Sequence, residues 1–152
     1  MRSLGLIAGL LMIVSCYAVQ IVTINNSFKE QQTAITEESL KLKEALDARL
    51  PVQSKATVGQ ISRHHVAFAE FSNALFIIGD DQVSKRWLKE HTDVLRKLHA
   101  LGFITNIKNP ETLNTLQTTS GLPLLPANVD DLMEILGTSH YPLMLNEGVV
   151  WQ

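Results

Sequence analysis

Residues 74–107, ALFIIGDDQVSKRWLKEHTDVLRKLHALGFITNI, carry the strongest signals for the architecture of this chain. It opens with a continuous apolar run at 74–78, which is typical of a strand covered on both faces. A helix is predicted next, because one apolar stripe recurs among charged neighbours: Trp87, Leu88, His91, Val94, Leu95 and Leu98. A second strand is predicted at 103–107, after Gly102 as the left-handed end of the helix. Strand, crossover helix and strand in this order predict a right-handed βαβ unit with parallel strands.

Two further elements follow this unit. Asn109 as cap and Pro110 at the first position predict a second helix, which ends by Gly121. A short strand is predicted at 122–125. Pro123 lacks an amide proton, which favours a sheet edge or a break over a central position.

The last elements are a short helix and a hairpin. Asn128 or Asp130 is predicted to cap the helix. Strands are then predicted at 143–145 and 149–151, joined by a turn in which Gly148 takes the position that needs a positive φ.

The dipeptide Tyr141-Pro142 lies directly before this hairpin. In thioredoxin-like folds a proline at this point is usually cis, beside the site where a substrate peptide lies. Only about 5% of X-Pro bonds in folded proteins are cis, so position favours cis here over a trans proline that opens an edge strand. The element order over residues 75–152 therefore predicts an α/β, thioredoxin-like domain.

Residues 1–18 are predicted to be a signal peptide that directs the chain to the periplasm. Arg2 is the only charge in this segment, and 4–14 is an apolar run of the length of a signal h-region, shorter than the roughly 20 residues of a spanning helix. We favour cleavage after Ala18. The alternatives are a lipoprotein signal ending at an acylated Cys16 and an uncleaved N-terminal anchor.

Residues 19–74 are predicted to form an N-terminal arm of strand and helix followed by a linker. A β-branched run at 19–24 indicates a short strand. Thr36 is interpreted as the N-cap of a helix that continues to Pro51. From there to Asn73 the pattern is irregular, which indicates a linker or an arm laid over the next domain.

Composition limits the chemistry. Cys16 is the only cysteine of the 152 residues, so cleavage after Ala18 leaves no thiol and lipidation consumes the one there is. Thiol–disulfide exchange by the mature chain is therefore excluded. The formal net charge of -2 provides no basic field for a phosphate backbone, which argues against direct binding of nucleic acid.

A family resemblance rests on residues spread over most of the predicted domain. They are Leu50-Pro51-Val52, Leu75 to Asp81, Ser84, Trp87-Leu88, Leu101-Gly102-Phe103, Asn106-Ile107, Gly121 to Ala127, Asp130-Asp131-Leu132, Leu136, His140-Tyr141-Pro142 and Gln152. Together they resemble the integrating conjugative element proteins, small exported proteins of integrative and conjugative elements. The resemblance covers about two thirds of the chain, the size of a small domain. It departs from the family at 17–49, where the aromatic and proline-rich stretch of longer members cannot be placed.

The resemblance implies a genetic context more than a chemistry. Members of the family are encoded beside genes for a conjugative type IV secretion apparatus, and their function is unassigned. The predicted domain is also similar to the thioredoxin-like assembly proteins of F-type conjugative pili, some of which lack redox cysteines. We therefore expect a noncatalytic component or assembly factor of that apparatus, a scaffold that binds other conjugative transfer-apparatus proteins and needs no cofactor.

The candidate partner-binding cleft combines the start of the helix that follows the strand at 74–78 with the Tyr141-Pro142 region. Its predicted residues are Asp80, Asp81, Ser84, His140, Tyr141, Pro142 and Trp151. An extended partner segment is expected either in this cleft or along the sheet edge at 149–151.

Each chemically suggestive residue also has a structural interpretation. Asp80 and Asp81 follow a predicted parallel strand at the end where ligands bind in open α/β sheets, but Asp also caps helices, and we favour capping. Ser84 lies near the position of a thioredoxin cysteine and is interpreted as a helix-start serine, because no GxSxG motif supports it. His91 is interpreted as a half-buried structural residue, and for His140 a packed or surface role is favoured over a functional one.

Two alternatives to the scaffold remain open. One is a metal-dependent enzyme that uses Asp80, Asp81 and His140. The other is a lipoprotein tether anchored through Cys16. Attachment to a membrane is expected only if Cys16 is lipidated or the signal stays uncleaved.

Overall fold

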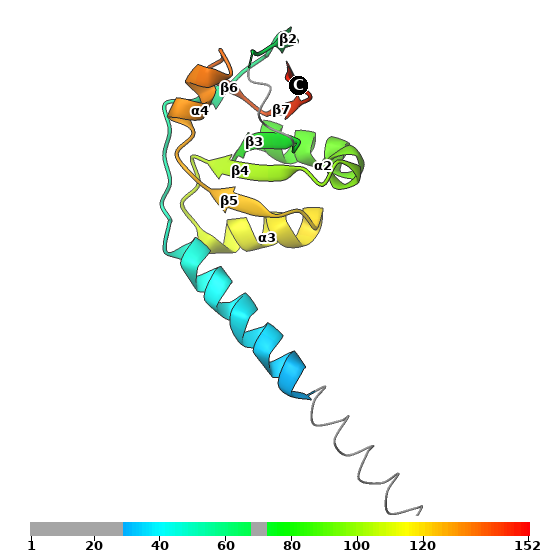
Figure 1. Ribbon diagram of the computed structural model, residues 1–152. Helices are drawn as coiled ribbons and strands as arrows, with labels where there is room; N and C mark the ends of the chain where they lie inside the picture. The colour runs from blue at the N-terminus through cyan, green and yellow to red at the C-terminus, as the bar shows by residue number, and fades with distance from the viewer. Residues whose placement is uncertain (1–28, 68–72) are drawn as a thin grey trace, which may run out of the picture. The chain divides into compact units, whose positions relative to one another are not determined.

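A computed structural model describes residues 29–67 and 73–152 of the chain (Figure 1). The chain divides into two compact units, Met1–Glu44 and Ala45–Gln152. The predicted signal peptide with Cys16 and Ala18, and the strand predicted at 19–24, lie outside the described residues.

The helix of the first unit starts earlier than predicted. Residues 29–47 are helical, so the interpretation of Thr36 as an N-cap is wrong. The Thr36 hydroxyl instead donates a hydrogen bond of 2.8 Å to the Gln32 carbonyl, one turn back in the same helix. Lys, Glu, Gln and Ala dominate residues 29–34, and these strong helix formers extend the helix through the expected start. All side chains of residues 29–44 are exposed.

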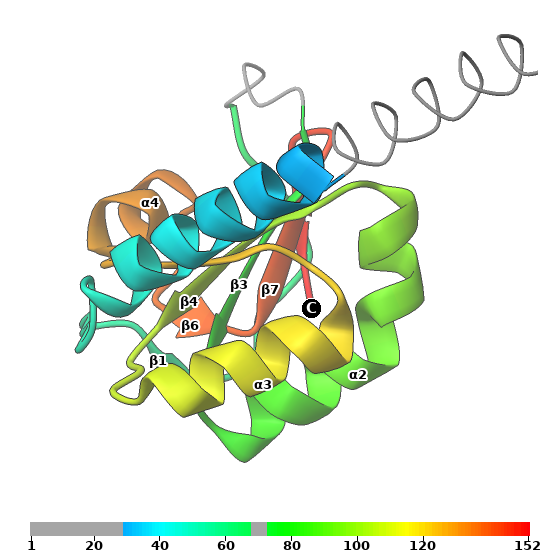
Figure 2. The ribbon, with the colours of Figure 1, turned by 90° about the horizontal axis from the view of Figure 1, so that it is seen from below.

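The second unit is a mixed α/β structure around a six-stranded sheet, in agreement with the predicted α/β class (Figures 1 and 2). The strand order is β2-β8-β7-β3-β4-β5. Strands β3, β4 and β5 are parallel to one another. Strand β7 runs antiparallel to β3, β8 antiparallel to β7, and β2 antiparallel to β8. A separate parallel pair joins β1 to β6. The strands are β1 (Thr57–Val58), β2 (His64–His65), β3 (Leu75–Gly79), β4 (Leu101–Thr105), β5 (Leu124–Pro126), β6 (His140–Tyr141), β7 (Leu143–Asn146) and β8 (Val149–Trp151).

Alternation along the central strand β3 divides the core in two. Phe76 and Ile78 belong to the cluster that contains residues of α2 (Gln82–Lys97) and α3 (Pro110–Ser120). Figure 2 shows these two helices side by side along the sheet. Leu75 and Ile77 belong to the other cluster, with Met133 of α4 (Asp130–Ile135). All five β3 residues are buried, which confirms the prediction of a strand covered on both faces.

The link between α2 and β4 corrects the prediction for Gly102. The helix ends at Lys97, and His99, with φ 48°, takes the left-handed conformation that was expected of the glycine. Gly102 lies inside β4, where a Cβ would collide with the Phe76 ring and with Leu124, 2.6 Å away. The strand at 101–105 therefore starts two residues before the predicted one, because a glycine serves close packing here and not a turn.

The later elements agree with their sequence signals, apart from one cap. Helix α3 has Asn109 as N-cap and a left-handed Gly121 as C-cap, and β5 is an edge strand, as Pro123 indicated. The N-cap of α4 is Val129, not Asn128 or Asp130. The Asn128 carboxamide still accepts a hydrogen bond from the Asp130 amide, 2.9 Å, so it supports the same turn from one residue further out. The hairpin turn has positive φ at Glu147 and Gly148.

Residues 51–66, here called the arm, lie against three places on the second unit. Val52 bridges Ile107, β1 pairs with β6, and β2 pairs with β8. The arm thus forms backbone hydrogen bonds with β6, which precedes the C-terminal hairpin, and with β8, which is the second strand of that hairpin.

Candidate functional site

The start of α2 is fixed by a compact hydrogen-bond cluster. The Asp81 carboxylate accepts from the Ser84 amide at 2.8 Å and from the Ser84 hydroxyl at 2.7 Å. The Gly79 amide donates to the Ser84 hydroxyl oxygen at 3.0 Å, and Ser84 is fully buried. The structure confirms that Asp81 caps the helix and that Ser84 is a helix-start serine.

Asp80 has a different partner. Its carboxylate lies 2.6 Å from the ammonium group of Lys85, in an ion pair at the partly exposed start of the helix. Among described residues, no three His, Cys, Asp or Glu side chains come together as a group able to hold a metal ion. Asp80, Asp81 and His140 therefore do not form the three-residue cluster that the metal-enzyme alternative requires.

Tyr141 is a core residue. Its ring covers Gly79 so closely that a Cβ there would lie 2.5 Å from the Tyr141 Cε2. The phenol oxygen accepts a hydrogen bond of 3.1 Å from the Asn106 side chain. Burial raises the pKa of the Tyr141 phenol, the Asn106 hydrogen bond partly opposes this, and the negative charge of Asp81 adds to the rise.

A polar cluster beside Tyr141 ties the arm to the end of β4, and sequence reasoning missed it. The Asn106 side chain accepts from the Ser54 amide at 2.8 Å and donates to the Ala56 carbonyl at 2.9 Å. The Ser54 hydroxyl bonds Thr105 at 2.6 Å and accepts from the Val129 amide at 2.9 Å. The available signal was an Asn directly after a buried strand, since Asn tolerates the left-handed φ of 52° found here.

The Tyr141–Pro142 peptide bond is cis, as predicted. The backbone beside it is already paired with the arm. The Thr57 amide donates to the Ser139 carbonyl at 3.0 Å, and the Gly59 amide donates to the Tyr141 carbonyl at 3.1 Å. The His140 ring contacts the arm as well, with Nδ1 3.1 Å from the Thr57 hydroxyl. An incoming chain therefore cannot pair with these carbonyls while β1 is in place.

The second expected docking place, the edge at 149–151, is also covered. Strand β2 pairs with Val149 and Val150. Trp151 lies against His91, with ring centroids 5.5 Å apart, and His91 stacks on Trp87 at 4.5 Å. His91 is partly buried and its Nδ1 is 2.9 Å from the Trp87 carbonyl, which fits the predicted structural role.

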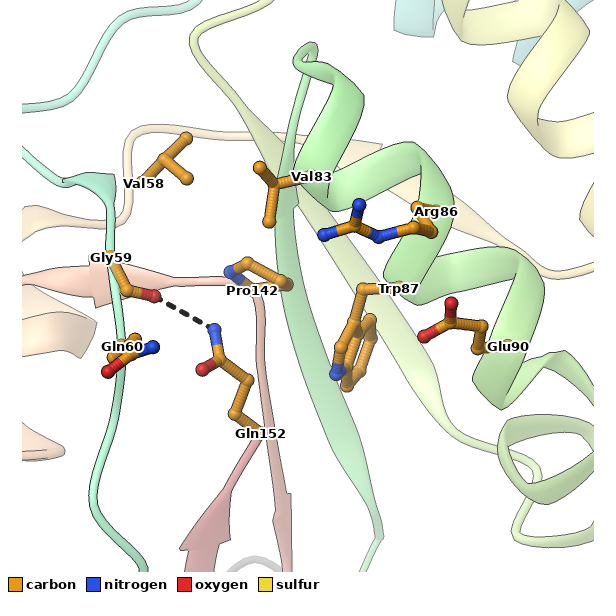
Figure 3. Close-up of a pocket in the computed structure, with 9 residues that line it drawn as sticks. All are labelled: Val58, Gly59, Gln60, Val83, Arg86, Trp87, Glu90, Pro142 and Gln152. Carbon is orange, nitrogen blue, oxygen red and sulfur yellow. Dashed lines mark hydrogen bonds between the residues drawn. The ribbon is translucent and has the colours of Figure 1, made fainter.

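An open groove of about 340 Å³ lies between α2 and the arm. Figure 3 shows α2 on one side and the arm with Pro142 and Gln152 on the other. The lining residues are Val58, Gly59, Gln60, Val83, Arg86, Trp87, Glu90, Pro142 and Gln152. Of the predicted cleft residues, Pro142 alone belongs to this lining, because the other six serve capping, ion pairing, the core, the arm or the aromatic stack.

The floor of the groove holds an unused donor. Trp87 is 5% exposed, and its Nε1 is the one buried side-chain nitrogen or oxygen in the described part of the chain without a hydrogen-bond partner. Leaving such a group unpaired costs about 1–3 kcal/mol. The rim adds the exposed side chains of Arg86 and Glu90, for which no ion pair is found within the described residues. The groove therefore combines apolar surface, one free N–H group and one charge of each sign.

None of the described helices has the length and apolar character that a membrane crossing requires. No curated protein and no solved structure matches the chain. The family model of a protein of unknown function, DUF2859, matches residues 13–150, so the chain belongs to the DUF2859 family.

Proposed function

We propose that this chain is a noncatalytic periplasmic component or assembly factor of a conjugative type IV secretion apparatus. It acts as a scaffold that holds a segment of another transfer-apparatus protein. The resemblance to integrating conjugative element proteins supports the genetic context. The groove between α2 and the arm is the observation that carries the binding role, since it presents open apolar surface beside an unpaired donor.

We further propose that the second unit is thioredoxin-like. The strand order β8-β7-β3-β4, with β3 parallel to β4 and antiparallel to β7, supports this assignment. So does the cis Tyr141–Pro142 bond directly before β7. In this proposal Asp81 and Ser84 occupy the helix start where a redox relative carries its cysteines, and their mutual hydrogen bonds serve the cap.

The binding role places the partner on side chains of α2 and not on a sheet edge. Both backbone edges near the C-terminal hairpin are paired with the arm. Val58 and Val83, 39% and 38% exposed, are the accessible apolar side chains of the groove. A partner segment that covers them gains burial without displacing the arm.

The test is crosslinking and mass spectrometry of the tagged full-length protein in cells that carry its native element. We expect recovery of transfer-apparatus proteins from the periplasmic fraction, and their loss with Val83→Asp. Lys89→Asp is the matched control, because Lys89 is exposed on α2 and lies outside the groove lining. Recovery of the protein alone, or equal recovery of partners with Val83→Asp, overturns the proposal.

A further inference from the structure

The groove has features that specify the segment it accepts, and the following inference rests on the proposed function. The first is the Trp87 N–H group, which is buried and has no acceptor in the described part of the chain. An apolar side chain cannot satisfy this group, whereas a backbone carbonyl oxygen can. In Figure 3 the indole nitrogen lies on the edge of the ring that is turned toward Gln152. The Gln152 side chain is exposed and held by a hydrogen bond to the Gly59 carbonyl at 2.8 Å, so it can move aside at small cost.

The second feature is the spacing of the charges on the α2 wall. Arg86 and Glu90 are four residues apart, which is about 6 Å along a helix axis. In an extended chain, residues i and i+2 project to the same side and are about 6.6–6.8 Å apart. An acidic and a basic side chain two residues apart on an extended segment therefore match Arg86 and Glu90. The residue between them projects to the opposite wall, where the exposed Val58 offers an apolar contact.

The third feature is the occupied backbone beside Pro142. Because the Ser139 and Tyr141 carbonyls already accept hydrogen bonds from the arm, strand addition at this point is blocked. Recognition must then come from side chains and from the indole donor.

We propose that the groove binds an extended partner segment of the pattern acidic, aliphatic, basic. The acidic side chain pairs with Arg86, the basic one with Glu90, and the aliphatic one contacts Val58. A backbone carbonyl of the same segment accepts the Trp87 indole hydrogen after Gln152 moves aside.

The experiment titrates the full-length protein with acetyl-Ala-Glu-Val-Lys-Ala-amide and follows the indole N–H resonances by two-dimensional NMR. The chain has two tryptophans, and the resonance of Trp151, whose ring contacts His91, is followed for comparison. We expect the Trp87 resonance to shift in a saturable manner and to move more than that of Trp151. Absence of a saturable Trp87 shift overturns the proposal.

Charge exchange tests the pairing without altering the core. Arg86→Glu is expected to weaken binding of the Glu-Val-Lys peptide about two- to fivefold, the range for exposed ion pairs. The same variant is expected to bind acetyl-Ala-Lys-Val-Lys-Ala-amide more tightly than the unchanged protein does. Lys89→Glu, on the same helix but outside the groove, should change neither affinity. Equal affinities of the unchanged protein and Arg86→Glu for both peptides overturn the charge pattern.

The two proposals fail separately. If the peptides do not bind but Val83→Asp still loses its partners in cells, the scaffold role stands and the sequence pattern is wrong. If Val83→Asp keeps all partners, the scaffold role of the groove is wrong whatever the peptides do.

Discussion

At the scale of single residues, His64 is held in a charge-dependent way. Its two ring nitrogens each lie 2.8 Å from a backbone carbonyl oxygen, of Ser62 and of Leu136. Carbonyl oxygens only accept, so both bonds form at once only when the ring is protonated. The bond to Ser62 and then that to Leu136 raise the pKa of His64 above its ordinary value, and burial partly opposes them.

This arrangement predicts a pH-dependent contribution to stability. Since the folded-state pKa of His64 lies above the unfolded one, the contribution is complete below the unfolded pKa and is lost as the pH rises through the folded pKa. The free energy of unfolding is measured with denaturant for the unchanged protein and for His64→Ala. The difference between the two proteins should be larger at about pH 5.5 than at about pH 8.5. His65→Ala, at the exposed neighbouring position on β2, is the control. A difference between the unchanged protein and His64→Ala that is the same at both pH values would contradict this prediction.

Gly79 and Tyr141 are coupled by contact. Gly79→Ala should destabilise the fold by about 1–3 kcal/mol, because the new Cβ meets the Tyr141 ring at 2.5 Å. The measurement is a double-mutant cycle with Tyr141→Ala, in which denaturant unfolding gives the free energy of unfolding of each of the four proteins. Once the ring is absent, Gly79→Ala should cost much less. Additive effects of the two substitutions would show that the ring is not the obstacle.

At the scale of elements, the β1 pairing depends on Gly59. A Cβ at this position would lie 2.5 Å from the His140 Cγ, so Gly59→Ala forces either the ring away from Thr57 or β1 away from β6. We expect the Thr57 and Gly59 amides to exchange hydrogen faster, about tenfold for each 1.4 kcal/mol of lost pairing. Gln60→Ala, at an exposed neighbour, should leave their protection unchanged. Unchanged exchange in Gly59→Ala would mean that the arm is held elsewhere.

The elements found from sequence are those with strong local patterns. The apolar stripe identified α2, and the Asn109, Pro110 and Gly121 signals identified α3. Strands β1, β2 and β6 have two residues each, and Thr57 and Val58 are exposed. A two-residue strand contains no full period of alternation, so pairing with distant residues is the only signal that defines it.

At the scale of the whole molecule, the two compact units predict independent folding of the second. Residues 29–44 are exposed throughout, whereas Leu46 and Leu50 pack against the core of the second unit. A chain that starts at Ala45 should therefore unfold cooperatively, with a thermal midpoint within about 2 °C of the longer protein by circular dichroism. A chain that starts at Pro51 lacks both leucines and should melt lower. A large drop in the midpoint of the chain that starts at Ala45 would show that the preceding residues stabilise the fold.

The sequence alone was sufficient to predict the α/β class, the order of the main elements, the parallel β3–β4 unit and the Asp81 cap. Each depends on residues close together in the chain, whose backbone preferences and apolar period act locally. The place of the groove follows from the folded structure and not from any local pattern in the sequence. The groove residues of the arm, 58–60, and those of α2, from Val83 onward, are more than twenty residues apart in sequence and form a common groove when β1 pairs with β6. For the same reason the sequence could not show that Trp87 lacks an acceptor, since a hydrogen-bond partner is a property of the packed environment and not of the residue.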